Sequence, residues 1–435
     1  SVIARFAVAY WLIPLYYEKE IYSPYDFMGN RLGEGARRLV TGLFALGSIL
    51  GQSVRVLVTA IILQVVTGMD APLCIVIIGA VAILWTFMGG MQTVIWTDVI
   101  QFCLFIFGGV LALSLLIGEL GWSQIVELNQ VTIDGSNKDK LTWLDFTTPF
   151  QEPRLRYTMW VALIAMPFQN FTAFGIDQLN TQRMFCCGSV KDARKAMCWS
   201  SISIIVTILM LAVGAGLFAW YRVYEPSGLI ATSFEKSNNV FPTWITMEVA
   251  PGLSGLILAG AFAAAISSLD SILAALSQAS LSVFYGRDKL EAAGNGREMV
   301  RLSRIVVCVW GVILTAAGLG LWVVYKKNPD SDLIGLAFGM VAYTYGPLLG
   351  VLAAAILPIK VSTKGLILGT ILSVLLVSWF RPELPLALEA MGLAAWAQNI
   401  ILLRPELTSE WFFPFNASIT LLCGWLGALL GSSEE

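Results

Sequence analysis

Four ionisable residues lie inside long apolar stretches of the sequence: Arg5, Arg55, Asp98 and Asp270. A charged side chain at the centre of a membrane helix costs about 2.5–3.5 kcal/mol on insertion scales, so each one marks a candidate functional site. Two simpler interpretations remain open. Arg5 is near the start of its stretch and can extend its guanidinium to the membrane surface. Asp98 can be a favourable negative charge near the N-terminus of its helix.

The segment LILAGAFAAAISSLDSILAALS brings together the largest set of oxygen atoms. Ala264, Ser267, Ser268 and Ser271 are spaced i, i+3, i+4 and i+7, so they share one face of a helix, and Asp270 lies three residues after Ser267. Hydroxyl, carboxylate and carbonyl oxygens are the ligands that a hard cation such as Na⁺ prefers. The alternative is that small and serine residues only allow two helices to pack closely.

A second polar group lies in IAMPFQNFTAFGIDQLNTQR, where Pro167 and Gly175 bracket Gln169, Asn170 and Thr172. Proline and glycine favour a discontinuous helix, and secondary transporters bind substrate beside such breaks near the middle of the membrane. The pattern therefore predicts a substrate site on this segment. An ordinary proline kink is the alternative.

Arg55 lies near the middle of its stretch, in GQSVRVLVTAI. A guanidinium in this position requires an anionic partner, and a carboxylate suits it because the two groups can form paired hydrogen bonds. The candidates are Asp98, Asp270 and a bound substrate. A permanent structural ion pair is the simpler interpretation.

The elements that must position these residues are membrane-spanning helices. Of 435 residues, 57% are hydrophobic and 13% are charged, and the mean hydropathy is +0.75. A span needs about 20 mostly apolar residues, and long continuous apolar stretches predict helices and exclude an alternating strand barrel. The sequence predicts an all-α polytopic membrane protein with about eleven spans, at 1–17, 38–67, 71–90, 94–118, 155–182, 192–221, 252–284, 298–325, 332–357, 362–380 and 411–431.

Lysine and arginine predict the orientation of these spans. Alternate loops at 18–38, 183–195, 286–304 and 358–364 hold more than half of the 27 Lys and Arg residues, although they are the shorter loops. Such an excess is typical of the cytoplasmic side. We expect a multi-pass protein of the plasma membrane, which in a bacterium is the inner membrane. The long polar segment 119–154 is expected outside and partly helical.

Absent residues narrow the function further. The sequence has no histidine, no G-x-x-x-x-G-K-[ST] motif and no TVGYG-like filter, which argues against a metalloprotease of the H-E-x-x-H type, ATP as the driver and a potassium-channel pore. A net charge of −2 gives no support for nucleic-acid binding. We expect no enzyme activity, organic cofactor or obligate protein partner, and the lipid bilayer and a small solute as partners. An intramembrane aspartyl enzyme using Asp98 and Asp270 and a passive channel remain alternatives.

Three stretches resemble the sodium/solute symporter family, which includes sodium–glucose, sialic acid, proline and monocarboxylate symporters. GGMQTVIWTDVIQ (89–101) is similar to its G-G-x-x-x-V-x-x-T-D-x-x-Q signature, and DQLNTQRMFCCGSVKDARKA (177–196) to its Q-x-x-x-Q-R-x-x-x-x-x-S-x-x-x-A stretch. GLILAGAFAAAISSLDS (255–271) resembles its small-residue ion-binding helix. The order and spacing agree from residue 1 to about 380.

The resemblance implies one transporter domain over 1–435, with an inverted five-plus-five helix repeat and alternating access. Residues 1–118 are then the remainder of the first repeat, with core helices 2–5, 155–357 the second repeat, with core helices 6–10, and 362–431 peripheral C-terminal helices. It also implies that residue 1 lies within the second core helix, so that the first one or two helices are missing from this sequence.

The resemblance also implies the ion sites. One Na⁺ is expected at Ala264, Ser267 and Ser268, together with carbonyl groups of the first core helix. Some members have a second sodium site, whose pattern corresponds to Asp98, Ser267, Asp270 and Ser271. The family often has serine or threonine where Asp270 stands, which leaves the number of ions and the role of Asp270 open.

Substrate contacts transfer less completely. Asn170 stands where sugar symporters have a sugar-binding asparagine, and Ala173 with the aromatic Phe174 stands at the inner-gate tyrosine. Ile204 and Gly339 replace two other polar sugar contacts. Arg55 is about one turn from an arginine that binds a carboxylate in sialic acid symporters. The sequence therefore predicts Na⁺-coupled symport of a small polar solute, with a carboxylate-bearing substrate as one hypothesis and a sugar as the alternative.

Overall fold

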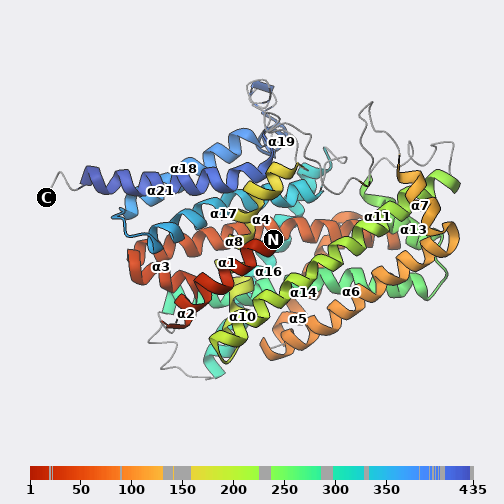
Figure 1. The fold of residues 1–435 in the computed structure, drawn as a ribbon, viewed down its shortest axis with the longest axis horizontal. Coiled ribbons are helices and arrows are strands. Elements are labelled where there is room, and N and C mark those ends of the chain that lie inside the picture. The colour runs from red at the N-terminus through yellow and green to blue at the C-terminus, as the bar shows by residue number, and fades with distance from the viewer. Residues whose placement is uncertain are drawn as a thin grey trace.

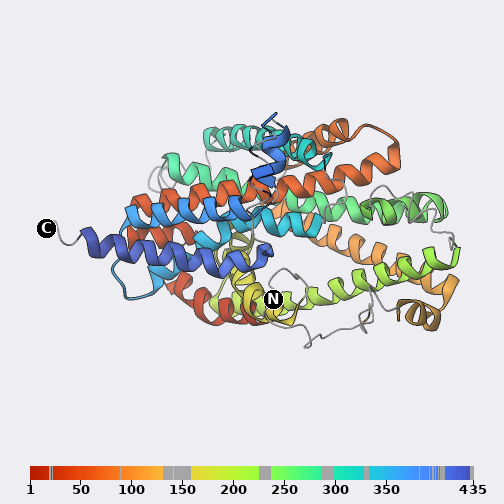
Figure 2. The same cartoon turned by 90° about the horizontal axis from the view of Figure 1, so that it is seen from above.

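The computed structural model describes residues 1–431 apart from 19–20, 22, 89–90, 131–140, 142–157, 225–236, 286–296, 328–332, 382, 391, 394–395, 397, 400 and 402–406. Throughout these described residues the regular elements are helices, and no strand occurs. The long helices run roughly along the longest axis of the molecule (Figure 1), and the view from above shows the same alignment (Figure 2).

The N-terminal part of the chain forms α1 (Val2–Ala7), a π-helical stretch (Val8–Leu12), α2 (Ile13–Glu18), α3 (Pro24–Leu32), α4 (Glu34–Thr67), α5 (Ala71–Met88), α6 (Met91–Leu120) and α7 (Trp122–Asn129). The turn between α4 and α5 begins at Gly68, whose φ of 72° is favourable for glycine. The partly helical loop predicted after residue 119 is helical in α7, and the rest of it from 131 to 157 lies outside the described residues except Leu141.

The middle part begins with a π-helical stretch (Val161–Ala165), α8 (Met166–Gly175) and α9 (Gln178–Phe185). It continues with α10 (Val190–Trp199), a 3₁₀ turn (Ser200–Ser203), α11 (Ile204–Tyr224), a 3₁₀ turn (Ser237–Asn239), α13 (Val240–Met247) and α14 (Leu253–Tyr285). The C-terminal part forms α16 (Arg297–Tyr325), α17 (Leu333–Ile356), α18 (Thr363–Phe380), α19 (Glu383–Ala390), a 3₁₀ turn (Ser409–Trp411) and α21 (Phe412–Gly431).

Nine helices within the described residues are long and apolar enough to cross a membrane. Two of the eleven predicted spans are not single long helices. The 1–17 stretch is helical from Val2 to Glu18 but changes to π-helical turns at Val8–Leu12, and the 155–182 stretch contains only a shorter apolar helix at Val161–Gly175. Large apolar side chains remain exposed on the outside of the bundle, for example Leu84, Phe107 and Leu211. Such a surface is suited to lipid rather than to water.

Small residues allow α6 and α14 to lie very close together. A Cβ atom added to Gly260 would be 2.7 Å from the carbonyl oxygen of Leu104, and one added to Gly108 would be 3.3 Å from the Cα atom of Ile257. A larger side chain at Gly260 would therefore force the helices apart. The packing role considered for the small residues of α14 is thus real, and it brings Asp98 of α6 within reach of the serines of α14.

Two of the basic loops and the long polar segment after residue 119 lie toward opposite ends of the bundle. α3, in the basic loop 18–38, and α10, which begins in the basic loop 183–195, lie toward one end of the bundle in Figure 1, and α7, in the long polar segment 119–154, lies at the other. This separation agrees with the alternation predicted from lysine and arginine.

Candidate functional site

Asp98 is the centre of a polar cluster between α6, α9 and α14. Ser267 donates its hydroxyl hydrogen to Oδ1 of Asp98 at 2.6 Å, and Nη2 of Arg183 donates to Oδ2 at 2.5 Å. The same Nη2 lies 2.7 Å from the hydroxyl oxygen of Ser271. The structure therefore brings together Asp98, Ser267 and Ser271, three of the four residues of the predicted second sodium site.

Arg183 is the member of this cluster for which the sequence predicted no role. It stands in the DQLNTQR motif, so the motif itself contained the signal, but nothing in the spacing connects it with Asp98. Its guanidinium places a positive charge where a second Na⁺ was expected. Asp98 therefore does not act only as a favourable charge at a helix N-terminus: it is ion-paired with a residue 85 positions away.

Asp270 is fully buried, and its two carboxyl oxygens differ. Oδ1 accepts a hydrogen bond from the backbone N–H of Ser271 at 2.6 Å. Oδ2 has no hydrogen-bond partner among the described residues. A buried oxygen without a partner is costly, which makes Oδ2 a favourable position for a proton or a cation.

Arg55 lies on α4 and contacts α14. Its Nη1 donates a hydrogen bond to the hydroxyl of Ser268, and it forms no ion pair with a described residue. Neither Asp98 nor Asp270 is its partner, so the structural ion pair considered from the sequence is absent from this part of the chain. Arg55 is exposed although it lies in the middle of a membrane helix. Its guanidinium is therefore accessible to a ligand.

The predicted first sodium site is also accessible. Ala264, Ser267 and Ser268 are each partly exposed, whereas Asp270 and Ser271 on the same helix are buried. Ser268 donates to the Ala264 carbonyl oxygen at 3.4 Å, so hydroxyl and carbonyl oxygens lie together. Within the described residues no three His, Cys, Asp or Glu residues come together as a metal site. The oxygen donors present suit a monovalent ion better than a transition metal.

The predicted substrate residues other than Arg55 lie on α8, which is continuous from Met166 to Gly175. The expected break between Pro167 and Gly175 is therefore absent, and the irregular backbone flanks the helix instead. The side chains of Asn170 and Thr172 are buried and donate to carbonyl oxygens of their own helix, at 2.9 Å to Met166 and 3.0 Å to Phe168. Gln169 and Phe174 are partly exposed.

Arg5 does not extend to the membrane surface as one interpretation held, because it is buried. Its Nη1 donates to the carbonyl oxygen of Ser200 and, at 3.0 Å, to the hydroxyl of Ser203. The 3₁₀ turn at Ser200–Ser203 interrupts α-helical bonding between α10 and α11, which accounts for an available carbonyl there. The Arg5 guanidinium also stacks 4.2 Å above the centre of the Phe174 ring. It thus connects α1, α8 and the start of α11.

A second polar cluster, centred on Asp177, connects α17 with the segment between α8 and α9. Tyr345 of α17 donates its hydroxyl hydrogen to Oδ2 of Asp177 at 2.6 Å, and the N–H of Leu179 donates to Oδ1 at 2.9 Å. The backbone N–H of Gln178 donates to the hydroxyl oxygen of Tyr25 on α3 at 3.2 Å. These contacts hold the start of α9 against two other helices.

The sequence matches one known protein family over most of its length. The model of the sodium:solute symporter family matches residues 2–373. The chain belongs to the sodium:solute symporter family. The nearly complete match confirms the resemblance that the three sequence stretches indicated.

Several relatives are named as transporters of sialic acid, monocarboxylates or iodide. The sodium/sialic acid symporter SiaT of Proteus mirabilis is 26% identical over 380 residues, which are 85% of this chain and 72% of the relative. Sodium-coupled monocarboxylate transporter 2 of Bos taurus is 25% identical over 428 residues, which are 92% and 65% of the two chains. The sodium/iodide cotransporter of Homo sapiens is 24% identical over 364 residues, which are 82% and 53%.

A solved structure has the same fold. It is the substrate-bound outward-open state of a Na⁺-coupled sialic acid symporter, with a TM-score of 0.73 and 23% sequence identity, and the match covers 99% of this chain and 83% of that one. The all-helical symporter fold expected from the sequence is confirmed. The chain is a multi-pass integral membrane protein of a transporter family, and the aspartyl-enzyme alternative is set aside.

Proposed function

We propose that this protein couples the inward movement of Na⁺ to the uptake of a small carboxylate-bearing solute by alternating access. Membership of the sodium:solute symporter family supports sodium-coupled transport. The observation that supports the substrate class is Arg55: it is an exposed guanidinium in the middle of a membrane helix that hydrogen-bonds Ser268 and has no carboxylate at ion-pair distance among the described residues.

The sodium ion binds at Ala264, Ser267 and Ser268 in this proposal. These residues lie on one accessible face of α14 and contribute hydroxyl and carbonyl oxygens. Asp270 and Ser271 lie on the next turn of α14, and Asp98 of α6 lies beside them, where Arg183 already balances the charge of Asp98. A second Na⁺ at that position would require Arg183 to withdraw, so we propose that one Na⁺ binds while the Arg183–Asp98 pair is intact.

Arg55 and Na⁺ compete for the hydroxyl of Ser268. Two positive charges a few ångströms apart repel each other strongly where little water screens them. When Na⁺ binds, Arg55 must therefore leave Ser268, and an anionic substrate is the partner that then neutralises it. This exchange couples the binding of Na⁺ to the binding of the substrate. The substrate neutralises the Arg55 charge that opposes Na⁺, and Na⁺ releases Arg55 from Ser268 so that it can bind the substrate.

The relatives support an anion as the transported solute. Sialic acid and monocarboxylates both carry a carboxylate, and iodide is also an anion. A sugar is the weaker candidate because Gly339 replaces a polar contact of sugar symporters. A side chain at Gly339 would overlap the guanidinium of Arg381, so this position has no room for a glutamine unless Arg381 moves. Gln169, Asn170, Thr172 and Phe174 complete the substrate site in this proposal.

A thermal-shift experiment tests the proposal. The purified protein is heated in Na⁺ or in choline with sialic acid, lactate, pyruvate, glucose and amino acids. We expect a carboxylate to raise the melting temperature only when Na⁺ is present, because both ligands bind the folded state. Stabilisation by glucose but by no carboxylate would favour the sugar symporter. Sodium-driven accumulation in proteoliposomes against a concentration gradient then separates a symporter from a passive channel.

The division of the domain belongs to the same proposal. The first repeat (1–118) and the second repeat (155–357) would move relative to each other, with 362–431 outside the moving core. α14 packs against both α4 and α6, so the sodium face lies where elements of the two repeats meet. The plasma membrane, in a bacterium the inner membrane, is the proposed location.

A further inference from the structure

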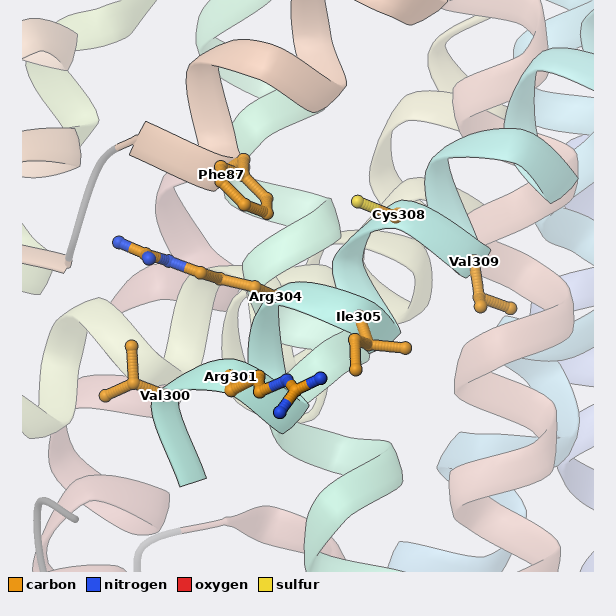
Figure 3. Close-up of a pocket in the computed structure, with 7 residues that line it drawn as sticks. All are labelled: Phe87, Val300, Arg301, Arg304, Ile305, Cys308 and Val309. Atoms are coloured by element: carbon orange, nitrogen blue, oxygen red, sulfur yellow. The ribbon is translucent and has the colours of Figure 1, made fainter. Parts of the chain in front are cut away.

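A groove of about 730 Å³ lies between the end of α5 and the beginning of α16, away from the sodium and substrate residues. Figure 3 shows its lining: Phe87 from α5, and Val300, Arg301, Arg304, Ile305, Cys308 and Val309 from α16. The groove is thus built from two arginines, one aromatic ring and a row of small apolar side chains. It has no part in the transport mechanism proposed above.

The position of the groove is at the edge of a membrane span. The span in α16 begins at Glu298, so Arg301 and Arg304 lie in its first two turns, about 5–9 Å along the helix. This end of α16 follows the loop 286–304, which belongs to the basic loop set. A positively charged site at this depth is at the level of lipid headgroups.

Both guanidinium groups are available to an anion. Arg301 and Arg304 are exposed, and neither forms an ion pair or a hydrogen bond with another residue that the structure describes, including Glu298 on the same helix. Arg304 reaches past the ring of Phe87, with 4.9 Å between its guanidinium carbon and the ring centre. Stacking of this kind limits the movement of the side chain and leaves its N–H groups free to bind phosphate oxygens in pairs.

An apolar stripe continues from the arginines toward the middle of the membrane. Ile305, Cys308 and Val309 follow Arg301 at i+4, i+7 and i+8, so they lie on the same face of α16. Ile305 and Val309 are 51% and 52% exposed. The nine residues from Arg301 to Val309 extend about 12 Å along the helix, enough to contact the first part of an acyl chain.

We propose that this groove is a binding site for an anionic glycerophospholipid of the membrane leaflet on the basic side. Arg304 binds its phosphate group beside Phe87, and Arg301, whose guanidinium points to the other side of α16 in Figure 3, adds positive charge at the same depth. Ile305, Cys308 and Val309 contact its acyl chain. The complementarity of charge identifies an anionic lipid rather than a zwitterionic one, because a choline or ethanolamine group would add a positive charge beside two arginines. This inference does not depend on which solute is transported.

Native mass spectrometry of the detergent-purified protein tests the site. Dioleoyl phosphatidylglycerol and dioleoyl phosphatidylcholine have the same acyl chains, so their difference in affinity reports the headgroup. A basic residue at a membrane surface contributes about 1 kcal/mol, or about fivefold in affinity. We therefore expect Arg301→Gln and Arg304→Gln each to lower the affinity for phosphatidylglycerol about fivefold, and the double variant to lower it about 25-fold.

The matched control removes two other charges from the same end of the molecule. Arg38 and Lys360 are exposed and lie outside the groove, so Arg38→Gln with Lys360→Gln should retain the affinity of the unmodified protein. The variant Arg301→Lys with Arg304→Lys should retain most of it. Each variant is checked by size-exclusion elution and by its melting temperature, so that misfolding is recognised independently of lipid binding.

Three results would overturn the proposal. One is equal affinity of the unmodified protein for the two lipids. Another is an equal loss in the Arg38/Lys360 control, which would show a general effect of charge. The third is displacement of the lipid by millimolar soluble glycerol phosphate, which would show an anion site that does not use the acyl chain. Retention of the lipid under that competition supports a lipid site.

Discussion

Two polar clusters, one around Asp98 and one around Asp177, lie in the same bundle and are built differently. The Asp98 cluster is partly open to solvent. The side chain of Asp98 is 17% exposed and that of Arg183 is 35% exposed. The Asp177 cluster is closed, with Asp177 at 8% and Gln178 at 1% exposure. Both oxygens of Asp177 have hydrogen-bond partners, whereas Asp270, beside the Asp98 cluster, has an oxygen without one among the described residues.

The difference separates residues that can exchange partners from residues that hold helices together. Water or an ion can replace a lost partner in an accessible cluster, so rearrangement there has a low cost. In a closed cluster each lost hydrogen bond leaves a buried polar group without a partner. We therefore expect changes around Asp98, Ser267 and Ser268 to affect ion binding, and changes around Asp177 and Tyr345 to affect stability.

The largest effect is expected for Asp98→Asn. The substitution keeps the size of the side chain but removes the negative charge that pairs with Arg183, and the single amide oxygen of asparagine cannot accept from Arg183 and Ser267 at separate atoms as the two carboxylate oxygens do. Sodium-driven uptake in proteoliposomes should fall at least about 100-fold, which corresponds to about 2.7 kcal/mol. Asp70→Asn, at an exposed position before α5, is the control and should leave uptake unchanged. Uptake by Asp98→Asn within about threefold of the unmodified protein would contradict the assignment.

Tyr345→Phe should lower stability rather than sodium affinity. It removes the hydroxyl that donates to Asp177, and leaves Oδ2 of a buried carboxylate without that partner. The free energy of unfolding should decrease by about 1–3 kcal/mol, measured as a lower melting temperature in a defined detergent. Tyr10→Phe removes an exposed hydroxyl and should leave stability unchanged. If Tyr345→Phe instead changes sodium affinity at constant stability, the contrast between the two clusters is wrong.

Ser268→Ala should lower the affinity for Na⁺ about tenfold, because one oxygen ligand worth about 1.4 kcal/mol is lost. Equilibrium binding of radiolabelled Na⁺ measures this change. Ser114→Ala is a close control, since Ser114 of α6 also donates to a carbonyl oxygen four residues earlier. Unchanged binding by Ser268→Ala would remove this residue from the sodium site.

The smallest effect is expected for Arg55→Gln. The informative result is whether this substitution raises or lowers the affinity for Na⁺. Without the guanidinium, Na⁺ no longer displaces a positive charge from Ser268, so sodium affinity in the absence of substrate should rise about threefold. The stabilisation by a carboxylate that depends on Na⁺ should disappear in the same variant. A fall in sodium affinity would contradict the proposed competition, and an unchanged response to carboxylates would remove Arg55 from the substrate site.

Much of the fold was predictable because lipid imposes a simple rule on the sequence. Long apolar stretches must become helices when no water can bond their backbone, and nine of them do so in the described residues. The helices in the stretches 1–17 and 155–182 were harder to predict from the sequence, because π-helical turns and the break at Ile176–Asp177 depend on tertiary contacts. The sequence predicted a break between Pro167 and Gly175, but the helix is continuous there.

The candidate sites were predictable only in part. The spacing of Ala264, Ser267 and Ser268 by itself determines that they share a face, because the helix period is a local property. Local geometry also places Asp177 before α9, where its side chain caps the helix.

Which groups meet across the bundle was decided only by the tertiary structure. Arg183 reaches Asp98 across 85 residues, Tyr345 reaches Asp177 across 168, and Arg55 reaches Ser268 across 213. Each of these pairs depends on the packing of helices, such as the close approach at Gly260, and on side-chain length. Several pairings of the same charges satisfy the sequence equally well, and the packing of the helices selects one of them.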